Sequence, residues 1–334
     1  MKTRILICVS LIVVVLTMAN LSVSHAQQAV GVSAAPPAGN GAPPLSNPLK
    51  VALLKWYAAN RVPTQFAVGQ QPYGLAFDGA NIWAANLADN TVSKVQASDG
   101  TVLGTFPAGG FEPYGVTFDG ANVWVSNLDS GNISELRASD GKLLGTFTVG
   151  SNPGWMTFDG ADLWVPYGNN LVAKIRASDG KTLGTFTVGN GPLAAACDGP
   201  NIWITNTADG TVTKLQASSG NTLGTFPVGS RPTGIAFDGA SIWIANRYSG
   251  TVSKLRASDG TLLGTFNVST SGPYGIAFDG ENIWVTGGTS IVELRASDGT
   301  QIGVFRSAAA SIGVAFDGAD VWVSLLKFNA VGKL

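Results

Sequence analysis

The sequence predicts an all-β fold, a seven-bladed β-propeller of four-stranded antiparallel blades. An Asp-Gly pair recurs seven times at intervals of 38 to 41 residues, and a tryptophan follows each aspartate by five residues. A repeat of about 40 residues with several short strand signals is typical of a propeller blade. The aspartates are Asp78, Asp119, Asp159, Asp198, Asp238, Asp279 and Asp317, and the tryptophans are Trp83, Trp124, Trp164, Trp203, Trp243, Trp284 and Trp322.

Residues 1–26 have the pattern of a cleaved secretory signal peptide. Lys2 and Arg4 precede an apolar run from Ile5 to Met18, and Ser24-His25-Ala26 offers small residues at the cleavage site. The alternative, a membrane-spanning helix, is disfavoured because the run is shorter than the ~20 residues that a bilayer needs. We therefore expect a periplasmic or secreted protein with no integral membrane segment after cleavage.

Cleavage changes the chemistry that the chain can perform. It removes two of the 20 basic residues and none of the 21 acidic ones, which leaves a net charge of 18 − 21 = −3. This balance argues against nucleic acid as a partner. It also removes Cys8 and His25, so Cys197 is the one remaining thiol and the mature chain has no histidine. The mature chain therefore has no internal disulfide and no imidazole.

Three further segments follow. Residues 27–47 are rich in Pro, Gly and Ala and predict a flexible tether. Residues 48–61 place Leu49, Leu53, Trp56 and Tyr57 at helical spacing after a proline, which predicts a short helix and connection. Residues 62–334 contain the repeats and are expected to form one propeller, as a monomer.

Each repeat divides into four strands, as the fifth copy illustrates. The strands are TGIAF, SIWIAN, TVSKLRA and TLLGTF, and Asp238-Gly239 and Ser258-Asp259-Gly260 supply two of the three turns. Asp-Gly pairs provide the positive φ that tight hairpins need. Consecutive strands should therefore pair antiparallel, as a meander.

The seventh repeat lacks its fourth strand, because the chain ends with FNAVGKL. Residues 62–69, VPTQFAVG, match the end of a fourth strand, and Phe66 falls where the other copies also have phenylalanine. We expect this N-terminal strand to complete the last blade and to close the ring without an open edge.

The repeat pattern PxGIAFDGxNIWIAN followed by GTVSKLRASDGTLLGTFPVG resembles the YVTN and NHL class of bacterial seven-bladed propellers. That class includes YncE-like proteins and, more distantly, streptogramin (virginiamycin B) lyases. The resemblance covers about residue 62 to the end and implies mostly binding or scaffold roles. It also implies, for the lyases, a histidine base near a magnesium site with acidic ligands. Because the mature chain has no histidine, lyase activity of that kind is not expected.

Other catalytic and metal-binding chemistries are weakly supported. The repeated aspartates are interpreted as turn formers, with a ring of calcium sites as the alternative, and we predict no metal and no cofactor. Cys197 stands where six copies have phenylalanine and is interpreted as a small hydrophobic residue. A paired-carboxylate site remains open, since four carboxylates lie in loops outside the repeated turns: Asp89, Glu112, Asp129 and Asp209.

The positions that differ between copies indicate a binding face. In a meander, the loops between strands two and three and those between successive blades emerge on the same side, which we call the loop face. Three tyrosines at the start of first strands would suit stacking on flat polar ligands, although they could equally plug the channel mouth. A pocket is expected between blades two and three or at blade five. The candidate residues are Tyr73, Tyr114, Trp155, Tyr167, Arg231, Arg247, Tyr248 and Tyr274.

The sequence thus predicts an exported binding or protein-interaction module, with a small molecule, a glycan or a protein as its ligand. Two alternatives remain: a carbohydrate- or peptide-active lyase or hydrolase without a catalytic histidine, and a structural cell-surface protein. We assign no catalytic residue.

Overall fold

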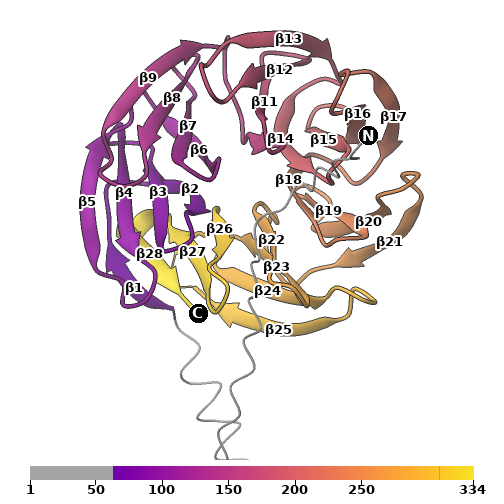
Figure 1. The fold of residues 1–334 in the computed structure, drawn as a ribbon. Helices are drawn as coiled ribbons and strands as arrows, with labels where there is room; N and C mark the ends of the chain where they lie inside the picture. The colour runs from indigo at the N-terminus through magenta and orange to yellow at the C-terminus, as the bar shows by residue number, and fades with distance from the viewer. Residues whose placement is uncertain (1–62, 308) are drawn as a thin grey trace, which may run out of the picture. The chain divides into compact units, whose positions relative to one another are not determined.

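The computed structural model describes residues 63–307 and 309–334, which form seven four-stranded antiparallel sheets (Figure 1). The predicted seven-bladed propeller is therefore confirmed. The expected signal peptide, tether and short helix fall in residues 1–61, outside the described residues. No helix in the described part of the chain is long and apolar enough to cross a membrane.

The first four blades each contain four consecutive strands. Blade 1 has β2 (Pro72–Phe77), β3 (Asn81–Asn86), β4 (Thr91–Gln96) and β5 (Val102–Pro107), and blade 2 has β6 (Pro113–Phe118), β7 (Asn122–Asn127), β8 (Asn132–Arg137) and β9 (Leu143–Thr148). Blade 3 has β10 (Thr157–Phe158), β11 (Asp162–Tyr167), β12 (Leu171–Arg176) and β13 (Thr182–Thr187), and blade 4 has β14 (Pro192–Cys197), β15 (Asn201–Asn206), β16 (Thr211–Gln216) and β17 (Thr222–Pro227).

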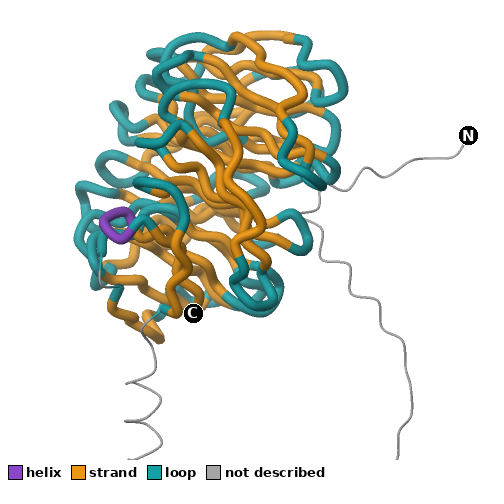
Figure 2. The backbone as a smooth tube through the Cα atoms, turned by 90° about the vertical axis from the view of Figure 1, so that its left-hand side faces the viewer, coloured by secondary structure: helices purple, strands orange, loops and turns teal. Residues whose placement is uncertain are grey.

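The last three blades complete the ring. Blade 5 has β18 (Pro232–Phe237), β19 (Ser241–Asn246), β20 (Thr251–Arg256) and β21 (Leu262–Asn267), and blade 6 has β22 (Ile276–Phe278), β23 (Asn282–Gly287), β24 (Ser290–Arg295) and β25 (Gln301–Arg306). Blade 7 has β26 (Val314–Phe316), β27 (Val321–Leu325), β28 (Ala330–Lys333) and β1 (Thr64–Ala67). A short 3-10 turn, η1 (Leu326–Phe328), lies among the loops at one side of the ring (Figure 2).

Blade 7 joins the two ends of the propeller, as the sequence predicted. β1 pairs antiparallel with β28, with Thr64 opposite Lys333 and Ala67 opposite Ala330. Phe66 lies 5.5 Å from Trp322 between ring centroids, the same contact that each other blade makes with its own phenylalanine. This pairing covers the edge of β28 and closes the ring.

Each blade has one large buried tryptophan held by the aspartate of its Asp-Gly turn. Six of the seven rings are fully buried, and Trp284 is 8% exposed. In the fifth blade, Asp238 Oδ1 accepts the backbone N–H groups of Ala240 and Ser241, while Oδ2 accepts the Trp243 indole N–H at 2.7 Å. The other six tryptophans donate to their aspartates at 2.6–2.8 Å. The sequence interpretation of these aspartates as turn formers is correct, but it missed the indole bond.

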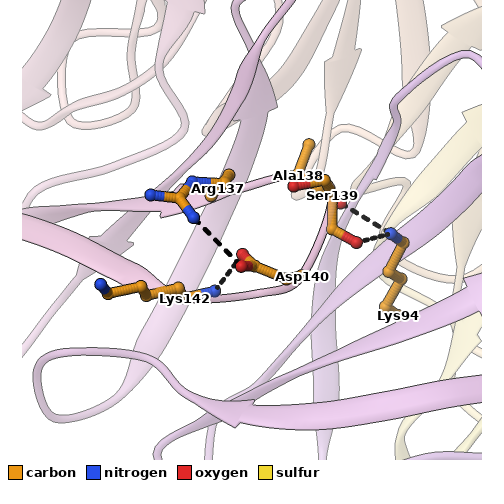
Figure 3. Close-up of polar contacts among 6 residues, drawn as sticks. All are labelled: Lys94, Arg137, Ala138, Ser139, Asp140 and Lys142. Carbon is orange, nitrogen blue, oxygen red and sulfur yellow. Dashed lines mark hydrogen bonds and ion pairs between the residues drawn. The ribbon is translucent and has the colours of Figure 1, made fainter.

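Lysines in the third strands join neighbouring blades, in a contact that we call the lysine lock. Lys94 Nζ lies 5.3 Å from the Trp83 ring centroid and donates to the carbonyl oxygens of Ala138 and Ser139, in the turn before β9, at 2.6 and 3.2 Å (Figure 3). Four more lysines repeat this contact with the next blade: Lys174, Lys214, Lys254 and Lys333. A buried or half-buried ammonium group thereby gains both an aromatic face and backbone acceptors.

The outermost strands of blades 1 to 6 carry one extra residue each, whereas β1 of blade 7 pairs without a shift. In blade 1, Lys94 pairs with Gly104 and Val95 pairs with Val102, so Leu103 has no partner in the register. This β-bulge recurs in blades 2 to 6. The extra side chains are 41–52% exposed: Leu103, Leu144, Leu183, Leu223, Leu263 and Ile302. A bulge increases local twist, so none of these outer edges is flat.

We expect Asp238→Ala to lower the free energy of unfolding by roughly 1–3 kcal/mol, because it leaves the Trp243 indole N–H buried without its acceptor. The measurement is urea unfolding followed by circular dichroism. Asp259→Ala is the control, since the Asp259 carboxylate lies in an exposed turn and binds Thr261 and Arg256 rather than an indole. Equal losses in the two variants would contradict this account of the aspartates.

Deletion of residues 329–334 should destabilise the whole ring, because it removes β28 and with it the pairing to both β1 and β27. Differential scanning calorimetry would show one transition at a lower temperature. Phe328→Ala, a change at a half-exposed side chain beside the deletion, is the control. An unchanged melting curve in the truncated chain would refute the closure.

Candidate functional site

The loop face is defined by backbone hydrogen bonds between two kinds of loop. In blade 5, the Arg247 N–H, just after β19, donates to the Arg231 carbonyl oxygen, just before β18, at 3.0 Å. Blade 1 makes the same contact between Leu87 and Gln71. All eight candidate residues from the sequence lie in or next to these loops.

Four of the candidate aromatic residues meet at the axis of the ring. The Tyr114 ring centroid lies 5.0 Å from that of Tyr73 and 5.8 Å from that of Trp155, and Trp155 lies 5.5 Å from Tyr274. The hydroxyl groups of Tyr114 and Tyr274 are hydrogen bonded to each other. Because these tyrosines belong to blades 2 and 6, on opposite sides of the ring, the contact crosses the axis (Figure 1). We call these four residues the aromatic cluster.

The aromatic cluster is mostly closed to solvent. Tyr114 and Tyr274 are 6% and 8% exposed, and the Trp155 indole nitrogen is buried with no hydrogen-bond partner among the described residues. Trp155 occupies the position at which five of the other first strands have glycine, and it packs against Gly115. The cluster therefore seals this end of the axis, and Tyr73 and Trp155 are its half-buried members.

Burial shifts the acidity of two cluster phenols. Burial, with a further contribution from Tyr274, raises the pKa of Tyr73 from 10.0 to about 12, although the nearby Arg247 opposes the shift. Burial raises the pKa of Tyr114 well above its usual 10.0, and its contacts with Tyr274 add to this effect. Both phenols are therefore neutral near pH 7, and act as hydrogen-bonding and packing groups rather than as bases.

Two arginines of blade 5 stack on tyrosines at the edge of the cluster, Arg247 on Tyr274 of blade 6 and Arg231 on Tyr248 of blade 5. The Arg247 guanidinium carbon lies 5.2 Å from the Tyr274 ring centroid. The Arg231 guanidinium stacks on Tyr248 at 4.8 Å and donates to its hydroxyl at 2.8 Å. Arg231, Arg247 and Tyr248 are exposed, with Tyr248 at 66%. This part of the loop face therefore combines positive charge, an exposed aromatic ring and hydrogen-bond donors.

The other candidate residues have packing contacts. Tyr167 is half-buried and packs against the apolar side chains between blades 2 and 3, which include Trp124 and Met156, so it does not join the aromatic cluster. Cys197 is half-buried against the core of blade 4, which agrees with its interpretation as a small hydrophobic residue.

The loop carboxylates hold the backbone of the loop face in place. Asp89 accepts the Gln70 N–H at 2.6 Å, and Asp209 accepts the Asn190 N–H at 2.7 Å. Within residues 63–307 and 309–334, no three His, Cys, Asp or Glu side chains lie close enough together to hold a metal ion.

A groove lies between blades 2 and 3, where the sequence suggested a pocket, but on the other face of the ring. It is lined by the first turns of both blades and the third turn of blade 3, which includes Ser178, and by the neighbouring strand residues Asn122, Glu135 and Arg176. Sequence reasoning placed the divergence of blade 3 on the loop face. It missed that the third strand of blade 2 has Glu135 where five blades have lysine, although that difference is visible in the repeat alignment.

No protein-family model and no curated protein matches this chain. Solved structures match in fold. Virginiamycin B lyase from Staphylococcus aureus has a TM-score of 0.69 at 20% identity, covering 81% of this chain and 97% of that one. A catalytically inactive histidine-to-alanine variant of the same lyase, with quinupristin, matches with a TM-score of 0.69 at 21% identity and the same coverage.

A third similar structure is hydrazine synthase from Kuenenia stuttgartiensis. Its TM-score is 0.71 at 16% identity, covering 80% of this chain and 96% of that one. At these identities the three structures share the seven-bladed propeller fold with this chain, and the fold alone does not define a function.

We expect Tyr73 to ionise near pH 12 and Tyr114 well above its usual pKa of 10.0, because burial disfavours the charged phenolate of both side chains. Their raised pKa values stabilise the fold fully below about pH 10, and this contribution is lost as pH rises toward 12. Phenolate absorbance during an alkaline titration measures the ionisation. Tyr73→Phe should remove a step near pH 12 and leave the steps at lower pH intact; loss of a step near pH 10 would contradict the assignment.

Proposed function

We propose that this protein is an exported binding module that uses the loop face of its propeller, and that its ligand is an anionic molecule with a flat ring, such as an acidic sugar. The two blade 5 arginines that stack on tyrosines, Arg231 on Tyr248 and Arg247 on Tyr274 of blade 6, carry this proposal. Export rests on the signal-peptide pattern of residues 1–26.

The chemistry of the two arginines supports an anionic ligand. Neither Arg231 nor Arg247 forms an ion pair with a described residue, whereas the exposed arginines Arg137, Arg176, Arg256 and Arg295 of the opposite face each pair with an aspartate. Stacking on tyrosine holds a guanidinium in place and leaves N–H groups that can bind a carboxylate, sulfate or phosphate. The exposed Tyr248 ring adds a surface on which a sugar ring can stack.

Charge across the loop face would also orient such a ligand. Arg231 and Arg247 lie on blade 5, and Lys327 lies on blade 7. The acidic loop residues Asp89, Glu112 and Asp129 lie on blades 1 and 2. An anion should therefore bind over blades 5 to 7 and be repelled from blades 1 and 2.

A lyase or hydrolase is a second candidate, favoured by the likeness to virginiamycin B lyase. The inactive form of that lyase is a histidine-to-alanine variant, and the single histidine of this chain is His25. An enzyme on this scaffold would therefore need carboxylate, tyrosine or arginine chemistry. The neutral state of Tyr73 and Tyr114 makes these two phenols poor general bases.

The test is a binding screen of the full chain against matched acidic and neutral oligosaccharides. Titration calorimetry then measures the affinity for each oligosaccharide that binds. We expect acidic members to bind, and Arg247→Ala or Arg231→Ala to weaken binding by roughly 10- to 100-fold, because each removes a charge-assisted hydrogen bond. Tyr248→Ala should weaken neutral and acidic members alike.

Arg256→Ala is the matched control, because Arg256 is exposed on the opposite face and paired with Asp259. The proposed site would be overturned if the Arg231 and Arg247 substitutions left the affinity unchanged, or if Arg256→Ala lowered the affinity as much as they do. Release of shortened products during the screen would favour the enzyme instead.

A further inference from the structure

The junction between blades 2 and 3 departs from the lysine lock. In the strand register, Glu135 lies opposite Trp124 as Lys94 lies opposite Trp83. Blade 3 still supplies the turn that receives the lysine elsewhere, here Ala177-Ser178. No described side chain donates to the carbonyl oxygens of these two residues. The junction therefore keeps the acceptors of the lock and lacks its cation.

Blade 6 also has glutamate at this position, Glu293, but its junction differs. The next blade takes its fourth strand from β1, so the Ala-Ser turn that would join β28 to a fourth strand is missing there. The backbone acceptors of the lock are thus absent from that junction in the described residues. The combination of free acceptors and a glutamate is specific to blades 2 and 3.

The junction between blades 2 and 3 forms an open groove of about 570 Å³. Two charged side chains of its wall are already paired, Arg176 with Asp179 at 3.0 Å and Asp162 with Lys174, which lies outside the wall, at 3.1 Å. Asp119 and Glu135 have no ion pair among the described residues. The groove thus has two carboxylates and two carbonyl oxygens without a cation.

The equivalent groove between blades 7 and 1 shows which group this geometry accepts. It is lined by Lys333, whose Nζ donates to the Ala97 carbonyl oxygen at 2.8 Å and pairs with Asp320 at 2.8 Å. Its volume is about 480 Å³. The same type of groove therefore binds a primary ammonium group from within the chain.

We propose that the groove between blades 2 and 3 binds a primary ammonium group on an alkyl chain, supplied by a small amine or by the lysine side chain of another polypeptide. The carbonyl oxygens of Ala177 and Ser178 and the carboxylate of Glu135 accept its hydrogen bonds. Asn122 donates to Glu135 at 2.7 Å and orients the carboxylate. Asp119 adds negative charge from the same wall.

The raised pKa of Glu135 agrees with a site that has no positive charge beside its carboxylates. Burial first, and then the charge of Asp119, raise the pKa of Glu135 above its usual 4.5, while the bond from Asn122 opposes the shift. Two carboxylates this close repel each other, and a bound cation relieves that repulsion.

The test is a titration of the isotope-labelled full chain with n-butylammonium chloride, followed by nuclear magnetic resonance. The reporter is the Trp124 indole N–H, which donates to Asp119 at 2.7 Å. We expect a saturable shift of this resonance and no saturable shift with tetramethylammonium chloride, which has the same charge but no N–H donor. Equal responses to the two salts, or none, overturn the proposal.

Three variants locate the site. Glu135→Lys restores the lysine lock and should abolish the shift, and Glu135→Gln should weaken binding about tenfold or more by removing the charge. Glu281→Lys makes the same charge change at an exposed turn of blade 6 and should leave the Trp124 shift unchanged. If Glu135→Lys still binds with wild-type affinity, the groove is not the site.

Two further probes distinguish the sources of the ammonium group. Tighter binding of Nα-acetyl-lysine amide than of n-butylammonium supports a polypeptide partner, and the reverse order supports a small amine. A saturable Trp124 shift with calcium chloride in place of the amines identifies an inorganic cation and overturns the proposal.

Discussion

The bond between each tryptophan indole and the aspartate five residues before it is the interaction on which the ring depends. An indole buried this deeply needs an acceptor for its N–H, and the aspartate supplies one oxygen to it and the other to the turn. One side chain therefore fixes the end of the first strand, the turn and the start of the second. Every blade repeats this arrangement with the same aspartate, glycine and tryptophan, and differences between blades are confined to other positions.

The repeat made the fold predictable, since local patterns of about 40 residues contain all the turns and strands of a blade. Closure by residues 64–67 was predictable too, because one strand was missing at one end and present at the other. The lysine lock was not, because each bond joins residues more than 40 positions apart in two blades. The contact between Tyr114 and Tyr274 was not predictable either, because it depends on the radius of the ring. That radius cannot be deduced from knowing which residues lie in loops.

The two faces of the propeller differ between blades at different positions. On the loop face, tyrosines from distant blades were predicted as a group, and the structure brings four aromatic residues together at the axis while Tyr167 packs elsewhere. Because these four aromatic residues are largely buried, the neighbouring arginines of blade 5 are the groups that a ligand can reach. On the opposite face, one exchange of lysine for glutamate leaves a blade junction with acceptors and no donor, so a change of one side chain converts a structural contact into a candidate binding site.

The bulges of the outer strands bear on how this protein behaves when it is concentrated. The outermost strands of blades 1 to 5 are short, uncharged and rich in leucine and threonine, and that of blade 6 is apolar apart from its two ends; a low charge and a high β-propensity are shared with segments that stack into fibrils. Fibril growth requires a straight edge along which backbone groups of a second molecule can align. The extra residue in each of these strands breaks that alignment near the middle of the strand. The ring can therefore expose apolar side chains along its outer edge and still resist polymerisation.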